Sequence, residues 1–88
     1  MRRRIPIVYK KLKTKWGWCK DKHLELDIRL KGKKHLEILI HECLHHVFYE
    51  KSEEEIEKKA IILTNTLWHE GYRRPDNDTS QPLQDGLT

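Results

Sequence analysis

Two histidines and a glutamate at a fixed spacing are the residues of this sequence best suited to do chemistry. They form the motif His41-Glu42-x-x-His45. Side chains four residues apart lie on the same face of an α-helix, so the two imidazoles can bind one tetrahedral metal ion. Glu42 lies beside them, where it can reach a water molecule at that metal and act as the general base of a hydrolysis. The spacing predicts a zinc site with His41 and His45 as ligands and Glu42 as the catalytic residue.

A third protein ligand is expected, because a catalytic zinc usually has three and keeps one position open. After the motif comes Ser52, with Glu55 three residues on, which is the pattern of a capping box at a helix start. The inner face of that helix is expected to hold Glu53, Ile56, Ala60, Leu63 and Leu67. An unpaired inward carboxylate is costly, and a metal removes the cost, so Glu53 is the predicted third ligand. Glu54 is the next candidate, and His69 is the rival for an arrangement with three histidines.

Other roles stay open at this stage. His46 points about a quarter-turn away from His45 and is expected at the surface or behind the ligands. Cys19 is a minor candidate for a ligand or a redox group, whereas Cys43 is read as a small apolar residue of the core. Three side chains are able to donate to an oxyanion, and the sequence does not choose among them: Tyr49, Tyr72 and His69.

The motif must sit on a helix, and residues 35–48 have a helical apolar pattern. The apolar positions are Leu36, Leu39, Ile40, Cys43, Leu44 and Val47. They lie roughly opposite the two histidines, so one side of the helix is expected in the core while the other floors a cleft. The alternative is a coincidental pair of half-exposed histidines, which a motif this short allows. A second helix is expected from Ser52 to about Glu70, with Gly71 as its cap, antiparallel to the first because the connection is short.

The segments before the helices favour strands. Residues 23–30 alternate strictly, which places Leu24, Leu26, Ile28 and Leu30 on one face and His23, Glu25, Asp27 and Arg29 on a solvated face. Residues 5–12 have the β-branched content of another strand. The segment around Trp16-Gly17-Trp18-Cys19 reads as a short extended piece whose tryptophans are expected in the core. Residues 31–34 are read as a turn into the first helix.

The length, the charge and the cysteine spacing of the chain limit the kinds of protein that it can be. The chain has 88 residues, 36% charged and 36% hydrophobic, with a net charge of +4. It is expected to form one domain over residues 1–72, followed by a disordered tail over residues 73–88. Membrane spans and a signal peptide are not indicated, so a cytoplasmic protein is expected. The diffuse positive charge favours solubility over nucleic-acid binding but permits weak phosphate contact. The two cysteines have no CxxC spacing, which argues against a zinc ribbon or a disulfide framework.

Four segments in this order resemble the small phage-type zinc metallopeptidases: Trp16–Cys19, Leu24–Leu30, Leu39–His45 and Ser52–Ile56. Those metallopeptidases are zincin-like proteins, more distantly similar to the ImmA/IrrE and SprT-like groups. The resemblance covers about residues 5–72, and its most specific part is the segment His41–His45. Where longer families carry Glu-x-x-Ala-Asn on the second helix, this chain reads Glu53-x-x-Ile56-Glu57. The resemblance implies an α+β fold with a minimal zincin-like core. In that core a small antiparallel or mixed sheet of two to three strands packs on the motif helix and on a second, antiparallel helix.

The function expected is therefore a zinc-dependent metallopeptidase that acts on a protein or peptide. A different class remains open, a non-catalytic, zinc-stabilised binding or regulatory module, such as one encoded by a phage. The chain is short for a protease, because a substrate cleft usually needs walls on both sides. The missing wall would have to come from a second copy or a larger complex.

Overall fold

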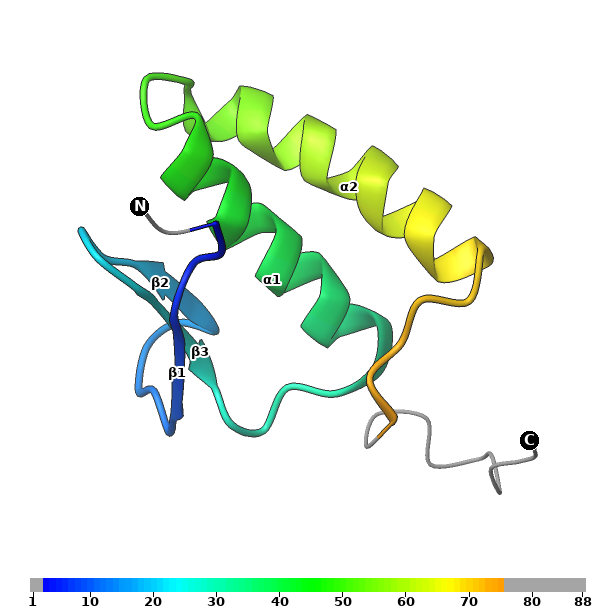
Figure 1. Ribbon diagram of the computed structural model, residues 1–88, viewed down its shortest axis with the longest axis horizontal. Helices are drawn as coiled ribbons and strands as arrows, with labels where there is room; N and C mark the ends of the chain where they lie inside the picture. Colours follow the sequence, from blue (N-terminus) through cyan, green and yellow to red (C-terminus); the bar gives the residue numbers. More distant parts are fainter. Residues whose placement is uncertain (1–2, 76–88) are drawn as a thin grey trace.

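A computed structural model describes residues 3–75 and shows three short strands followed by two helices (Figure 1). The strands are β1 (Ile7–Lys10), β2 (Gly17–Cys19) and β3 (Leu24–Asp27). They form one sheet in the order β1-β3-β2, in which β3 is parallel to β1 and antiparallel to β2. The predicted α+β class with a small mixed sheet is confirmed. The tail expected over residues 73–88 lies mostly outside the described residues.

The core is small and centred on β3. Leu24 and Leu26 are fully buried, and so is Ile56 of the second helix, while Ala60 is 1% exposed. Alternation along β3 turns the two leucines toward the helices. Each fully buried side chain of this kind contributes about 1.5–3 kcal/mol relative to an exposed one. The fold therefore depends on a few large apolar residues from the sheet and the helices.

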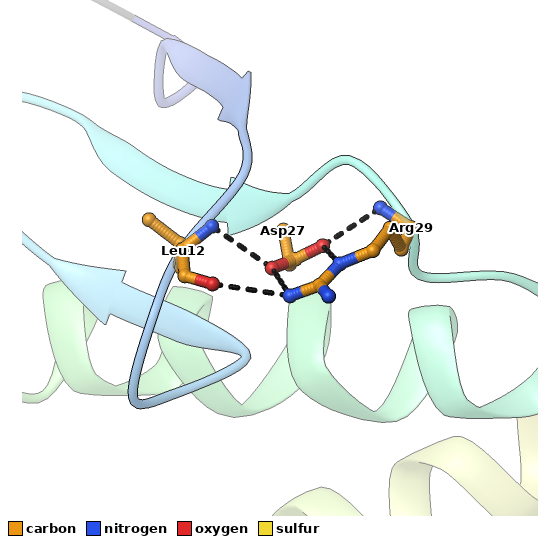
Figure 2. Close-up of polar contacts among 3 residues, drawn as sticks. All are labelled: Leu12, Asp27 and Arg29. Atoms are coloured by element: carbon orange, nitrogen blue, oxygen red, sulfur yellow. Dashed lines mark hydrogen bonds and ion pairs between the residues drawn. The ribbon is translucent and has the colours of Figure 1, made fainter.

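The strand predicted over residues 23–30 ends at Asp27, and two side chains differ from the prediction. Ile28 was expected in the core and is 61% exposed, whereas Asp27 was expected in solvent and is fully buried. The chain turns at Ile28 and Arg29, so the alternation stops at Asp27. Figure 2 shows that Asp27 lies within a set of contacts from Arg29 and Leu12. The buried carboxylate ties the chain after β1 to the end of β3.

All four donors around Asp27 point at its two oxygens. Oδ1 accepts from the backbone N–H of Arg29 at 2.8 Å and from its Nε at 2.7 Å, while Oδ2 accepts from Arg29 Nη2 at 2.7 Å and from Leu12 N–H at 2.9 Å. Arg29 Nη2 also donates to the Leu12 carbonyl oxygen at 3.0 Å. The Arg29 hydrogen bonds hold the pKa of the Asp27 carboxyl well below its usual range. A charged, fully bonded carboxylate is the form that this buried position favours.

Helix α1 (Gly32–Val47) lies between the sheet and the second helix (Figure 1). It begins three residues earlier than predicted: the backbone of Gly32 takes a φ of +61°, and Lys33 and Lys34, which were expected in a turn, are already helical. Val47 was predicted in the core and is 56% exposed, since it occupies the last helical position beyond the sheet. The helix is thus packed on two sides rather than on one apolar stripe.

Helix α2 (Glu53–His69) runs antiparallel to α1 (Figure 1). Its predicted start is confirmed, because the Ser52 hydroxyl accepts from the backbone N–H of Glu55 at 3.2 Å. Its predicted end is confirmed as well. Gly71 has a φ of +94°, and its N–H donates to the Trp68 carbonyl while the N–H of Tyr72 donates to that of Leu67. This pair of bonds is a Schellman cap.

The inner face of α2 differs from the prediction at one step. Leu63 was expected to face inward and is 41% exposed, whereas Thr64 is 2% exposed. Both positions lie one turn from Ala60, so the spacing alone fits either of them. The packing of α2 on α1 buries Thr64, four residues after Ala60, and leaves Leu63, three residues after it, exposed. The buried Thr64 hydroxyl oxygen has no hydrogen-bond partner among the described residues. Within the part of the chain that the structure describes, no helix is long and apolar enough to cross a membrane.

Candidate metal centre

The two motif histidines lie together on α1. His41 and His45 are one helical turn apart, and their ring centroids are separated by 4.8 Å with the planes tilted by 60°. Their side chains are 18% and 23% exposed, so each ring is largely enclosed while one edge remains open. Because α1 continues for several residues on both sides, its regular backbone holds the two rings side by side. Both can turn a nitrogen toward one point.

Helix α2 brings a carboxylate to that point. Glu53 is the first residue of α2, directly after the Ser52 cap. Its Oε2 lies 3.0 Å from His41 Nε2, and its Oε1 lies 2.7 Å from His45 Nε2. One carboxylate therefore spans both imidazoles across the helix pair. The sequence argument placed Glu53 on the buried inner face, but its side chain is 68% exposed, because the end of α2 lies at the rim of the helix pair.

The geometry of these three side chains fits a metal ion. The ligand atoms of His41, His45 and Glu53 all lie within 4.8 Å of one another. In a tetrahedral zinc site with metal–ligand distances of about 2.0–2.2 Å, the ligand atoms lie about 3.3–3.6 Å apart. The carboxylate contacts at 2.7 and 3.0 Å are slightly shorter than this. Two imidazoles with one carboxylate are a donor set that zinc accepts, so these three residues could hold such an ion.

Glu42 lies next to this cluster on the side that faces the sheet. A Cβ atom built on Gly17 of β2 would lie 2.9 Å from Glu42 Cγ, 3.1 Å from Glu42 Oε2 and 2.8 Å from Ile38 Cγ2. Burial raises the pKa of the Glu42 carboxyl, and the charge of Glu53 adds to this, while His41 and His45 act in the opposite direction. Glu42 is half-buried between β2 and the histidines. A carboxylate held in this way is suited to accept a proton.

The other candidate ligands lie elsewhere. Glu54 is 82% exposed and pairs with Lys58 at 3.8 Å, so it points away from the histidines. His69 ends α2, about 24 Å along the helix axis from Glu53 at about 1.5 Å per residue. Cys19 is not part of the cluster, and burial together with the nearby Glu42 carboxylate raises the pKa of its thiol. A raised thiol pKa disfavours the thiolate that a metal would require.

His46 and the two tyrosines that were candidate oxyanion donors lie at different places in the structure. His46 lines a different cavity of about 640 Å³ beside Arg3 and Arg4. Tyr49 is 85% exposed just beyond α1, which leaves it near the end of the helix that carries His45. Tyr72 lies past the far end of α2, where it lines a cavity with Trp68. Of the three proposed oxyanion donors, only Tyr49 is at the end of the helix pair where the histidines lie.

Gly17 is the residue that sequence reasoning missed. The segment around it was read mainly for its two tryptophans, which were expected in the core but are 45% exposed at Trp16 and 41% exposed at Trp18. Any side chain at position 17 would come too close to Ile38 and Glu42, so a glycine is needed for β2 to lie this near to α1. A glycine inside a strand often marks such a close approach, and this was the signal available.

Comparisons with models of known protein families, with curated proteins and with solved structures give no match. The chain is therefore described by its own features, as a small α+β domain in which His41, His45 and Glu53 could hold a metal ion.

Proposed function

We propose that this protein is a zinc-dependent metallopeptidase in which His41, His45 and Glu53 hold the ion. The observation that carries the proposal is the Glu53 carboxylate, which reaches both imidazole nitrogens across the helix pair at 3.0 and 2.7 Å. When bound, zinc would act as a Lewis acid and lower the pKa of a bound water to about 7. The resemblance of the motif and of the second helix to the phage-type metallopeptidases supports the same assignment.

Glu42 is the general base in this proposal. It follows His41 directly and lies one turn before His45, so its carboxylate is beside the ligands without being one of them. It takes a proton from the attacking water and passes it to the amine that leaves when the peptide bond breaks. Its side chain lies against β2, where a Cβ atom built on Gly17 would approach Glu42 Cγ to 2.9 Å.

The strand next to Glu42 supports a peptide as the substrate. β2 pairs only with β3 in the described sheet, so its other edge has backbone groups available for pairing. An extended peptide can add to such an edge through main-chain hydrogen bonds. A peptide at this edge would run past the glycine that lies against Glu42, which brings its carbonyl groups toward the candidate centre.

The test combines metal analysis with a peptide-library assay on Glu42→Gln and the wild type. We expect one zinc per chain in both proteins and at least about a 100-fold loss of cleavage in the variant, because general-base catalysis contributes about 10²–10⁴-fold. Glu54→Gln is the matched control, since it removes a neighbouring carboxylate that points to solvent. If the Glu42 variant cleaves peptides as fast as the wild type, the proposed mechanism is wrong.

A second function is supported by the fact that the three candidate metal ligands come from two different helices. His41 and His45 come from α1 and Glu53 from α2, so a bound ion would join the two helices whether or not it does chemistry. The protein would then be a zinc-stabilised binding module. Bound zinc without chelator-sensitive cleavage by the wild type would favour this module over the peptidase. Absence of bound zinc after purification with the metal present would remove both functions.

A further inference from the structure

The face of the sheet opposite the helices has an unusual composition. Both helices lie on one side of the sheet (Figure 1). The register pairs Glu25 of β3 with Val8 on one side and Trp18 on the other, and alternation turns all three away from the buried leucines. Val8 is 43% exposed and Trp18 is 41% exposed. We name this surface, together with Trp16 at its end, the open sheet face. Large aromatic side chains left this exposed often mark an interaction site.

Positive charge gathers in the same part of the chain. Residues 10–29 contain seven lysine and arginine side chains and three acidic ones, a net charge of +4 that equals that of the whole chain. The acidic groups on this face are already paired. Asp27 binds Arg29 at 2.7 Å, and Glu25 lies 3.5 Å from Lys10 Nζ. The fold places three of these cations beside the exposed tryptophans.

Three of these cations lie directly against the exposed tryptophans. Lys15 Nζ is 3.3 Å and Lys20 Nζ is 4.7 Å from the centre of the Trp18 ring, and the Arg29 guanidinium is 5.4 Å from that of Trp16. The buried Asp27 fixes Arg29 in this position through its two hydrogen-bonded oxygens (Figure 2). Both lysines lie over the Trp18 ring, so a base stacks there only when it displaces an ammonium group, which its flexible stem allows to move to the adjoining phosphate. Rings and cations grouped in this way match the two parts of a nucleotide, a base and a phosphate.

We propose that the open sheet face binds single-stranded nucleic acid, with bases stacked on Trp16 and Trp18 and phosphates against Lys15, Lys20 and Arg29. Single strands are favoured over duplexes because only unpaired bases expose the flat surfaces that tryptophan stacks on. They are favoured over an acidic peptide because carboxylates use the cations but leave the rings unoccupied. This surface lies on the face of β2 opposite the candidate metal centre, because alternation turns Trp18 away from the side on which Gly17 lies against Glu42.

The test is fluorescence anisotropy of the full chain with a labelled thymidine dodecamer. We expect a Kd of about 1–100 µM at physiological salt, the range typical of non-specific nucleic-acid binding. Trp18→Leu should weaken binding at least about fivefold, as expected for the loss of one stacked base. The logarithm of affinity should fall with that of salt concentration with a slope of about −2, since three phosphate contacts on a single strand contribute about −0.7 each.

Lys20→Gln provides a second measurement, which removes one charge and keeps both tryptophans. It should weaken binding and reduce the salt slope by about 0.7. Lys58→Gln is the matched control, because that lysine is 74% exposed on α2, away from Trp16 and Trp18, and pairs with Glu54 at a distance of 3.8 Å. Equal binding of the duplex, no binding of the dodecamer, or equal effects of the two lysine substitutions would each overturn the proposal. So would equal affinity for a polyglutamate of the same charge.

Discussion

A single buried carboxylate, Asp27, shows how one residue can hold two parts of this chain together. It is fully buried, yet each of its oxygens accepts two hydrogen bonds: Oδ1 accepts both from Arg29, and Oδ2 accepts one from Arg29 and one from Leu12 (Figure 2). Removing a partner from such a group leaves a buried charge or donor unsatisfied, which is more costly than breaking an exposed pair. Its role is structural, and it also keeps Arg29 next to Trp16.

The lowered pKa of Asp27 predicts how stability depends on pH. A carboxyl whose folded pKa lies below its unfolded value of about 3.9 contributes stability above that value, and the contribution is lost as pH falls further toward the folded pKa. The wild type should therefore lose free energy of unfolding below about pH 4 more steeply than Asp27→Asn, which lacks the titrating group. Urea unfolding at a series of pH values measures this. Asp21→Asn, at an exposed position, should follow the wild type.

At the scale of the elements, the fold depends on how closely β2 approaches α1. Helix α1 is the central element, in contact with the sheet on one side and with α2 on the other (Figure 1). β2 reaches it through Gly17, and α2 reaches it through the cap that places Glu53 beside the histidines. The candidate centre is thus built where three elements meet.

Gly17→Ala tests this approach. Strand propensity alone predicts that alanine stabilises the protein, since glycine weakens a strand. The added Cβ would instead lie 2.8 Å from Ile38 Cγ2, so we expect a loss of about 1–3 kcal/mol in the free energy of unfolding, as overpacking usually costs. Denaturant unfolding measures the change. In a double-mutant cycle with Ile38→Ala, which removes Cγ2, the two losses should be less than additive. A stabilised Gly17→Ala would show that β2 lies farther from α1.

Gly71→Ala tests the cap of α2. The residue has a φ of +94°, and nothing lies within 4 Å of an added Cβ, so the substitution changes backbone strain without creating a clash. Left-handed backbone costs an L-residue about 1–2 kcal/mol, partly offset by the reduced entropy of the unfolded chain, and we expect a net loss of about 1 kcal/mol. Thermal unfolding checks it, with Asn65→Ala on the exposed side of α2 as the control. Unchanged stability would contradict the Schellman cap.

At the scale of the whole molecule, metal binding and folding are expected to be coupled. The three candidate ligands come from both helices, while the fully buried core contains few large side chains. A ligand that binds only the folded protein stabilises it by about 2.7 kcal/mol at 100 times its Kd. A small domain gains from such a link between helices, because its own core is limited.

This coupling predicts that zinc raises the melting temperature of the wild type and that a chelator reverses the change. Glu53→Ala should abolish most of the increase, because it removes the only donor supplied by α2 among the three clustered residues. Scanning calorimetry with and without zinc measures the shift. Glu54→Ala should retain it, since that side chain points to solvent. An equal shift in both variants would show that the ion binds elsewhere.

Local patterns in the sequence were enough to predict much of this protein. The helical spacing placed His41 and His45 on one face, Ser52 and Gly71 marked the ends of α2, and alternation identified β3. Each of these features depends on residues a few positions apart, whose geometry the backbone sets. The α+β fold class was expected from the resemblance to the phage-type metallopeptidases, and the observed order of strands and helices confirms it.

Only the tertiary structure decided how these elements meet. Glu53 was predicted as a ligand because it continues the apolar inner face of α2. Its side chain is exposed, however, and it reaches the histidines from the rim of the helix pair. The burial of Asp27, the choice of Thr64 over Leu63 and the contact of Gly17 with Glu42 also depend on partners distant in the sequence. Periodicity determines which face a residue occupies within its element. It does not determine the rotation and crossing of one element against another, because these follow from packing the whole core.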